Sequence, residues 1–238
     1  MILRISSILI LLISTSCAPT PQVKQMRQVP AQPAAASTVG EDLTSMATMR
    51  QIVARVEPIG EQICRDTRRV SNCDFKIEVD TSTPDVVNAY QTQEKDGRPL
   101  VVFSMGLLKT AKNTDEVAFV LGHEMAHHIS GHIDQRRGSA GLGGLILGGL
   151  VAYSGGSAQG IDSAFDLGAA VGSRIYSKEH ELQADEIGTL ITHYAGFYPV
   201  RGSKFFIRIP DPGDEFLGSH SPNAARIDRV NRTIARLR

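Results

Sequence analysis

The chain has 238 residues, with 25 basic and 25 acidic side chains and no tryptophan. This length fits one ordinary domain with an appendage. A net charge of zero gives no overall attraction to phosphate, and the sequence has no long basic run, so nucleic acid is excluded as an expected partner. The number of cysteines, three, is odd, which in an exported protein requires an explanation for the unpaired thiol.

The first 16 residues have the features of an export signal: Arg4, then an apolar run, then small residues. They resemble a bacterial lipoprotein signal, which implies that Cys17 carries lipid and becomes the new N-terminus; an ordinary cleaved signal is the alternative. By the same resemblance, Ala18 after the cysteine favours the outer membrane. We therefore expect a bacterial periplasmic protein that is lipid-anchored to a membrane, with the proline-rich residues 17–40 as a flexible tether.

Residues 41–238 are expected to form one mildly acidic domain. Apolar side chains recur every three or four positions over 42–66, which predicts an amphipathic helix that is interrupted near Pro58. Cys64 and Cys73 follow, and in an oxidising compartment we expect them to form a disulfide that stabilises the fold by about 2.7 kcal/mol. Two independent buried thiols are the alternative.

Three segments have strand-like patterns, and an Asp-Gly turn at 95–98 joins the last two of them. They lie at residues 75–80, 88–93 and 99–104. Further helices are expected over residues 106–111, 115–130, 162–195 and 222–238. Asn113 or Thr114 is the expected cap of the second of these helices, and Ser221 that of the last. The fold class is thus α+β, mainly helical with a small antiparallel β-sheet.

Residues 138–172 contain eleven of the 22 glycines and no basic residue. The apolar stretch 140–153 is only 14 residues long, short of the roughly 20 that a membrane-spanning helix needs. We expect a flexible lid or a helical insertion here, with membrane contact as the less favoured alternative.

A metal-binding motif, His-Glu-Met-Ala-His, stands at residues 123–127. His123 and His127 are four residues apart, so on a helix both imidazoles project from one face and can bind one Zn²⁺ ion. Glu124 lies beside them, where its carboxylate can act as a general base on water. The motif lies among apolar residues, so a solvated pair of histidines is the poorer interpretation.

A catalytic zinc site needs a third protein ligand. Glu181 and Asp185 are four residues apart on one face of a predicted helix. Glu181 can complete the coordination, and Asp185 can accept a hydrogen bond from the second ring nitrogen of a ligand histidine. His128 and His132 lie off the face of His123 if that helix continues, so we expect them to be solvated or to lie at the C-terminal end of the helix.

HEMAH at 123–127, EHELQADEIG at 179–188 and His220 shortly before Arg226 together resemble the HtpX-like family of zinc metallopeptidases, which also contains the CaaX prenyl endopeptidase. The resemblance implies a zincin-type (gluzincin) domain with one Zn²⁺ per chain, in a minimal periplasmic lipoprotein form. The roles that it implies are zinc ligands His123, His127 and Glu181, catalytic base Glu124, and supporting acid Asp185. It places His220 near the metal, where it stabilises an oxyanion or occupies the fourth coordination position.

The expected function is that of a zinc-dependent endopeptidase acting on unfolded or misassembled cell-envelope polypeptides. An extended substrate is expected to add to the edge of the hairpin at 88–104. The alternative is a zinc-containing lipoprotein that acts as a chaperone or assembly factor with little or no proteolysis. Glu124 favours the enzyme, because a purely structural metal site has no use for a base beside the metal.

Overall fold

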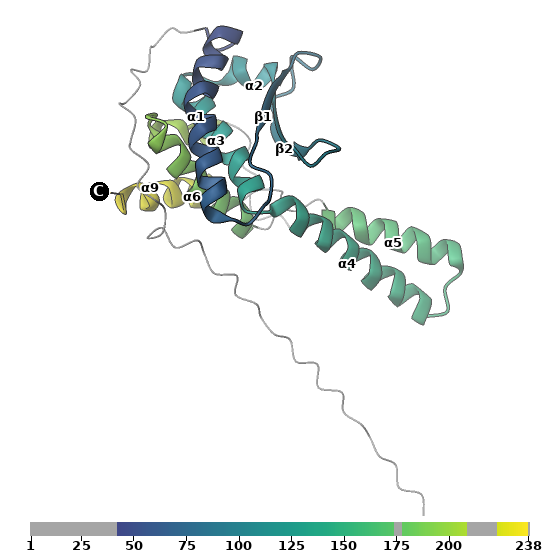
Figure 1. Ribbon diagram of the computed structural model, residues 1–238. Coiled ribbons are helices and arrows are strands. Elements are labelled where there is room, and N and C mark those ends of the chain that lie inside the picture. Colours follow the sequence, from purple (N-terminus) through teal and green to yellow (C-terminus); the bar gives the residue numbers. More distant parts are fainter. Residues whose placement is uncertain (1–41, 174–177, 209–222, 238) are drawn as a thin grey trace, which may run out of the picture.

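The computed structural model describes residues 42–173, 178–208 and 223–237 (Figure 1). The export signal, the tether with Cys17, His220 and the expected cap Ser221 lie outside the described residues. For these, the expectations from sequence remain predictions.

The described chain is mainly helical, with one small sheet, which confirms the α+β class. The helices are α1 (Met46–Thr67), α2 (Met105–Thr110), α3 (Thr114–Ile129), α4 (His132–Tyr153), α5 (Ala158–Ser173), α6 (Lys178–Tyr194), α7 (Pro199–Gly202), α8 (Phe205–Arg208) and α9 (Asn223–Ala235). The strands are β1 (Lys76–Asp80), β2 (Ala89–Gln93) and β3 (Pro99–Ser104).

The sheet has the order β1-β3-β2 and lies alongside α1 and α3 (Figure 1). Strands β2 and β3 form the expected antiparallel hairpin. The expectation of a wholly antiparallel sheet is wrong, because β1 pairs with β3 in parallel and the sheet is mixed. β3 is the most buried strand, with Val101 and Phe103 fully enclosed, so burial of its apolar side chains favours the central position.

Helix α1 runs without a break through Pro58, contrary to the interruption expected there. A proline removes one helical hydrogen bond, but the buried face of α1 continues on both sides of it, with Val56 and Ile59 in the core. At Gly60 the helix approaches α3 so closely that a Cβ would overlap the side chain of Met125. Tertiary packing therefore offsets the local cost of the proline.

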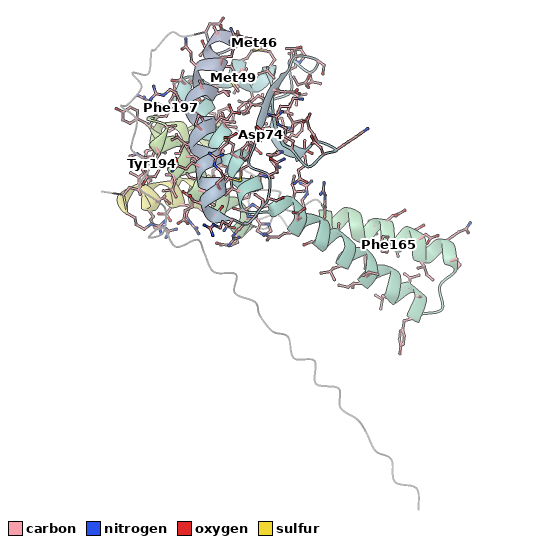
Figure 2. The ribbon with its side chains drawn as sticks, viewed as in Figure 1. Met46, Met49, Asp74, Phe165, Tyr194 and Phe197 are labelled. Carbon is pink, nitrogen blue, oxygen red and sulfur yellow. A yellow bond between two sulfur atoms is a disulfide. The ribbon has the colours of Figure 1, made fainter. Side chains whose placement is uncertain are left out.

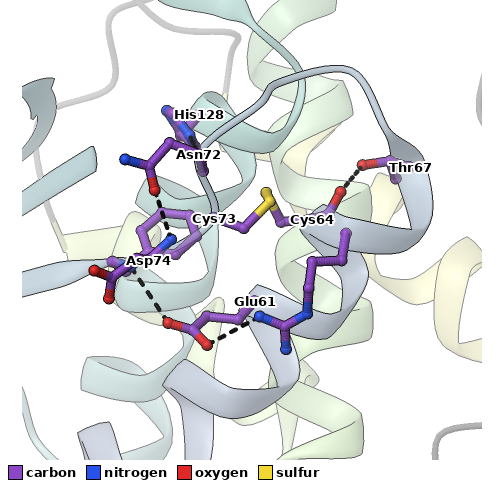
Figure 3. Close-up of a disulfide and its surroundings, with 9 residues drawn as sticks. Glu61, Cys64, Thr67, Asn72, Cys73, Asp74 and His128 are labelled. Atoms are coloured by element: carbon purple, nitrogen blue, oxygen red, sulfur yellow. Dashed lines mark hydrogen bonds and ion pairs between the residues drawn. A yellow bond between two sulfur atoms is a disulfide. The ribbon is translucent and has the colours of Figure 1, made fainter. Parts of the chain in front are cut away.

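A disulfide joins Cys64, near the end of α1, to Cys73, with 5.8 Å between the Cα atoms (Figure 3). The expected pairing is confirmed. The bridge holds the segment before β1 against α1, and the neighbouring Asn72 carbonyl accepts a hydrogen bond of 2.7 Å from His128 Nε2 on α3. The disulfide thus ties α1 to the loop that supports the outer side of α3.

Helix α3 lies in the centre of the domain. Asn113 caps it by accepting a 3.1 Å hydrogen bond from the backbone N–H of Glu116, so Asn113 rather than Thr114 is the cap. Of the 16 residues of α3, all but Glu124 are buried. The rest of the domain therefore encloses α3, and Glu124 is the one residue of this helix that is partly exposed.

Helices α4 and α5 pack against each other and project from the domain as a helical hairpin (Figure 1). They include residues 138–172, for which a lid or helical insertion was expected; their role as a lid stays a prediction. Among the helices that the structure describes, none combines the length and the apolar character needed to cross a membrane.

Candidate metal centre

Three buried side chains on two helices converge on one point. His123 and His127 come from α3 and Glu181 from α6, and one donor atom of each lies within 4.8 Å of the others. The Nε2 atoms of the two histidines are 3.1 Å apart. The Glu181 carboxylate lies 3.4 Å from each of these nitrogens. The structure thus brings together the three residues that the sequence predicted as ligands.

Helix periodicity and a close helix crossing produce this arrangement. Residues four apart share a helix face, which aligns the two histidines on α3. Between α3 and α6, a Cβ on Gly188 would lie 2.9 Å from the backbone nitrogen of His123, and a Cβ on Gly122 would lie 3.0 Å from the Gly188 carbonyl oxygen. Only glycine allows this approach, which places Glu181 in reach of the histidines.

Asp185 and Arg226 hold the outer side of His123. Asp185 Oδ1 lies 3.0 Å from His123 Nδ1, as the sequence predicted. Arg226 of α9 donates two hydrogen bonds to the Asp185 carboxylate, of 2.9 Å from Nε and 2.8 Å from Nη2. Arg226 Nη2 also lies 3.2 Å from His123 Nδ1, but the Asp185 oxygen is closer and a carboxylate only accepts. Nδ1 of His123 therefore donates to Asp185, and Nε2 is the atom turned toward the other ligands.

His132 and Gln183 form a corresponding chain of hydrogen bonds on the outer side of His127, which was not expected. His132 Nδ1 lies 3.0 Å from His127 Nδ1, and His132 Nε2 lies 3.0 Å from the amide oxygen of Gln183. An amide oxygen only accepts, so His132 donates through Nε2 and its Nδ1 accepts from His127. This leaves the Nε2 lone pair of His127 directed toward Glu181 and His123.

The expectation that His132 faces away as a solvated side chain is wrong. It assumed a continuous helix, but α3 ends at Ile129 and Gly131 adopts a left-handed conformation with φ of 67°. The chain turns there, and fully buried His132 comes back beside His127. His128 lies in the last turn of α3, as one of the two alternatives expected, but it is buried, and its ring packs edge-on against Phe75, with 5.3 Å between the ring centroids.

Burial and ion pairs decide which histidines of this cluster are protonated at neutral pH. Burial lowers the pKa of His127 well below its usual value and lowers that of His132 to about 4, so both rings are neutral at neutral pH. Burial and Arg226 also lower the pKa of His123, but hydrogen bonds to Asp185 and Glu181 outweigh them and raise it to about 9. A cation bound at His123 takes the place of that proton.

Burial also acts on the Asp185 carboxyl, where it raises the pKa. The Arg226 guanidinium and the hydrogen bond to His123 outweigh burial and keep the pKa of Asp185 below its usual value. Asp185 is therefore a carboxylate at neutral pH, as its role as hydrogen-bond acceptor requires.

The donor set fits a divalent metal ion. Two imidazole nitrogens and a carboxylate oxygen are ligands that such ions bind readily, and each histidine already has its outer nitrogen in a hydrogen bond. Three protein donors leave a further coordination position for water or substrate.

A cavity of about 320 Å³ opens beside this cluster and is lined by both His123 and Glu124. Val87 and Asn88, which precede β2, and Ala89, its first residue, form part of its wall. Phe206 of α8 lines it too, with its ring centroid 3.3 Å from the Arg226 guanidinium carbon and 5.9 Å from that of His123. Glu124 thus meets the cavity next to a ligand histidine.

Three residues of the site were missed by the sequence reasoning: His132, Gln183 and Arg226. Gln183 lies inside the motif-like segment 179–188, and Arg226 follows His220 by six residues, but neither pattern indicates a role for these two side chains. Their positions depend on the turn at Gly131 and on the packing of α9 against α6, neither of which has a periodic signal in the sequence.

Comparison with known proteins adds two findings. The sequence model of the family described as Peptidase family M48 matches residues 52–234, which is more than half of the chain. The mitochondrial metalloendopeptidase OMA1 of Saccharomyces cerevisiae is 28% identical to this chain over 148 residues. The alignment covers 58% of this chain and 41% of that relative, so the chain matches less than half of the relative's length.

Proposed function

Because the chain belongs to peptidase family M48, we propose that it is a zinc-dependent endopeptidase that cleaves unfolded or misassembled polypeptides of the cell envelope. Membership makes the chain a metallopeptidase with a zincin-type fold, here of the gluzincin kind with Glu181 as third donor. The observation that carries the proposal is the position of Glu124. It is the single residue of α3 that is not buried, and it shares a cavity with His123.

The proposed chemistry is hydrolysis with Glu124 as general base. His123, His127 and Glu181 would hold the zinc ion, which would supply Lewis-acid polarisation of the scissile carbonyl and a lowered pKa, toward about 7, for the attacking water. Glu124 accepts a proton from the attacking water and delivers it to the leaving amine. Asp185 and His132 keep the ligand histidines in the tautomers that expose Nε2. His220, by family resemblance, is proposed to stabilise the oxyanion or to occupy the remaining coordination position.

An extended polypeptide is the proposed substrate. In the described part of the chain, β2 is an edge strand, and its first residue, Ala89, lines the cavity of Glu124 together with the two residues before it. A substrate strand that pairs with this edge presents its backbone to the site. Such pairing recognises the substrate backbone more than its side chains, which supports broad specificity. Unfolded chains present an extended strand more readily than folded ones.

The cell envelope is the proposed location. The signal-like first 16 residues and Cys17 support a lipid-anchored periplasmic protein at the outer membrane. The disulfide between Cys64 and Cys73 supports an oxidising compartment. The proposed partners are therefore envelope polypeptides and, through the anchor, the membrane.

The substitution Glu124→Gln tests the proposal. We expect the variant to keep one zinc per chain and the wild-type unfolding midpoint, but to cleave a reduced, alkylated protein about 10²–10⁴-fold more slowly, as expected for loss of a general base. The matched control is Glu179→Gln, whose side chain on α6 is 69% exposed. Equal cleavage by the wild type and Glu124→Gln would contradict the enzymatic role. A wild-type protein that holds zinc and suppresses aggregation without cleavage would favour the chaperone alternative.

A further inference from the structure

Helices α4 and α5 approach each other where two glycines of α4 face Phe165 of α5. A Cβ on Gly144 would lie 2.9 Å from the Phe165 ring, and a Cβ on Gly148 would lie 3.4 Å from Cβ of Phe165. Phe165 on α5 therefore rests against the bare backbone of α4 (Figure 2). The contact between the two helices uses the smallest residues of α4.

Five large apolar residues of α4 are exposed, whereas Leu147 and Val151 are partly buried. The five exposed residues recur at spacings of three and four, so they form one stripe along the helix, which we call the α4 stripe. Its members are Leu142, Leu145, Ile146, Leu150 and Tyr153, with exposed fractions between 62% and 92%. In water, a helical hairpin buries such a stripe between its helices. Small residues at the helix contact and large apolar residues outside are typical of helix pairs in lipid.

The two helices of the hairpin differ in their charged residues. No Lys, Arg, Asp or Glu occurs between Arg137 and Asp162, so α4 is uncharged from its second turn to its end. Helix α5 exposes Asp162 and Asp166, which lie one turn apart. Helix α5 also exposes Leu167, but a carboxylate in lipid is costly, so α4 suits an apolar medium better than α5 does.

The expected lipid anchor and tether before residue 42 allow the hairpin to reach a membrane. Residues 1–41 precede the domain, and their expected lipid attachment at Cys17 leaves about 24 residues of tether, which span up to roughly 80 Å when extended. The apolar stretch at 140–153 is too short to cross a bilayer, so it suits a helix that lies in the interface.

From these observations we infer that the α4 stripe docks on a lipid surface, with α4 lying in the plane of the interface and α5 on its water side. The inference goes beyond the peptidase function and does not depend on it. Helix α4 follows α3 directly after Gly131, so docking of α4 also sets how the metal centre is held relative to the membrane.

A flotation assay with phosphatidylcholine vesicles tests the docking. Every sample is the chain after the export signal, residues 17–238 with Cys17→Ser, so that neither the apolar signal nor a lipid anchor contributes. We expect this protein to float with the vesicles, and the additional pair Leu145→Gln and Ile146→Gln to lower the bound fraction at least fivefold with an unchanged unfolding midpoint. The matched control pair, Asp162→Asn and Asp166→Asn on α5, should bind at least as well as the parent.

Fluorescence tests the orientation of the hairpin. The chain has no tryptophan, so a single introduced indole is an unambiguous reporter. We expect brominated phosphatidylcholine to quench Ile146→Trp on the α4 stripe but not Ser163→Trp, which lies between the exposed aspartates of α5. Equal quenching, or none at either position, would overturn the inferred orientation.

Two other outcomes would assign the α4 stripe to a protein partner and overturn the inference. One is that the glutamine pair converts a dimer into a monomer in gel filtration without changing vesicle binding. The other is that the pair weakens binding of a reduced, alkylated protein in the absence of vesicles and leaves flotation unchanged. Neither outcome bears on whether Glu124 catalyses hydrolysis.

Discussion

At the scale of single residues, the outer hydrogen bonds of the two ligand histidines decide which ring nitrogen can bind a metal. Asp185 occupies Nδ1 of His123, and His132 occupies Nδ1 of His127. Asp185 was expected as a partner, because it lies four residues after Glu181 on the same helix face. His132 was not expected, because a helical projection from His123 places it on the wrong side of α3.

The substitution His132→Ala tests whether this outer bond matters for the metal. It removes the acceptor for the His127 Nδ1–H, and we expect zinc affinity to fall about 10–100-fold, measured by competition with a chromogenic chelator. His132→Asn supplies an oxygen near the place of Nδ1 and should restore part of the affinity. His193→Ala, on the half-buried outer side of α6, is the control. If the alanine and asparagine variants bind zinc equally weakly and unfold at the same lowered temperature, His132 acts through packing alone.

At the scale of elements, two glycines set the crossing of α3 and α6 and a third ends α3. Gly122 and Gly188 bring the two backbones together beside His123, and Gly131 turns the chain so that α4 starts with His132. At Gly131 the nearest atom to a Cβ would be 4.0 Å away, so conformation rather than space requires glycine there. The periodicity of the apolar residues predicts the helices themselves. Their close crossing depends on the absence of a side chain at Gly122 and Gly188.

Gly188→Ala should therefore disturb both stability and the site. A methyl group has no room against the His123 backbone, and we expect a loss of about 1–3 kcal/mol in the free energy of unfolding, measured by urea denaturation. Zinc binding should weaken as well, because α6 carries Glu181 away from α3. Gly149→Ala is the control, since a Cβ there meets nothing within 4 Å and alanine favours a helix by up to about 1 kcal/mol. A stability loss without any change in zinc affinity would contradict the role of this crossing in the site.

At the scale of the whole molecule, the disulfide connects the first helix to the segment that supports the metal helix. The disulfide links Cys64 on α1 to Cys73 (Figure 3), and beside Cys73 the backbone carbonyl of Asn72 accepts a hydrogen bond from His128 on α3. Burial lowers the pKa of His128, so this bond is made by the neutral ring at neutral pH. The bridge therefore restrains the unfolded chain and also supports α3 from outside.

The double substitution Cys64→Ser and Cys73→Ser should lower the free energy of unfolding by about 2.7 kcal/mol, the chain-entropy value for a loop of this size. Urea denaturation measures it, and wild-type protein under a reducing agent should show the same loss. Cys17→Ser is the control, because Cys17 precedes the domain and should not affect its stability. An unchanged midpoint in the double variant would mean that the native packing alone holds this loop.

The sequence by itself determined the local features of this protein. The ligand pair on α3, the carboxylates four residues apart on α6 and the disulfide pairing all depend on short spacings, which helix geometry and chain length convert directly into proximity. Only the tertiary structure decided the parallel pairing of β1, the return of His132, the place of Arg226 and the exposed stripe of α4. These features depend on how elements far apart in the chain pack, and packing is set by the shapes of both partners rather than by the pattern of either one.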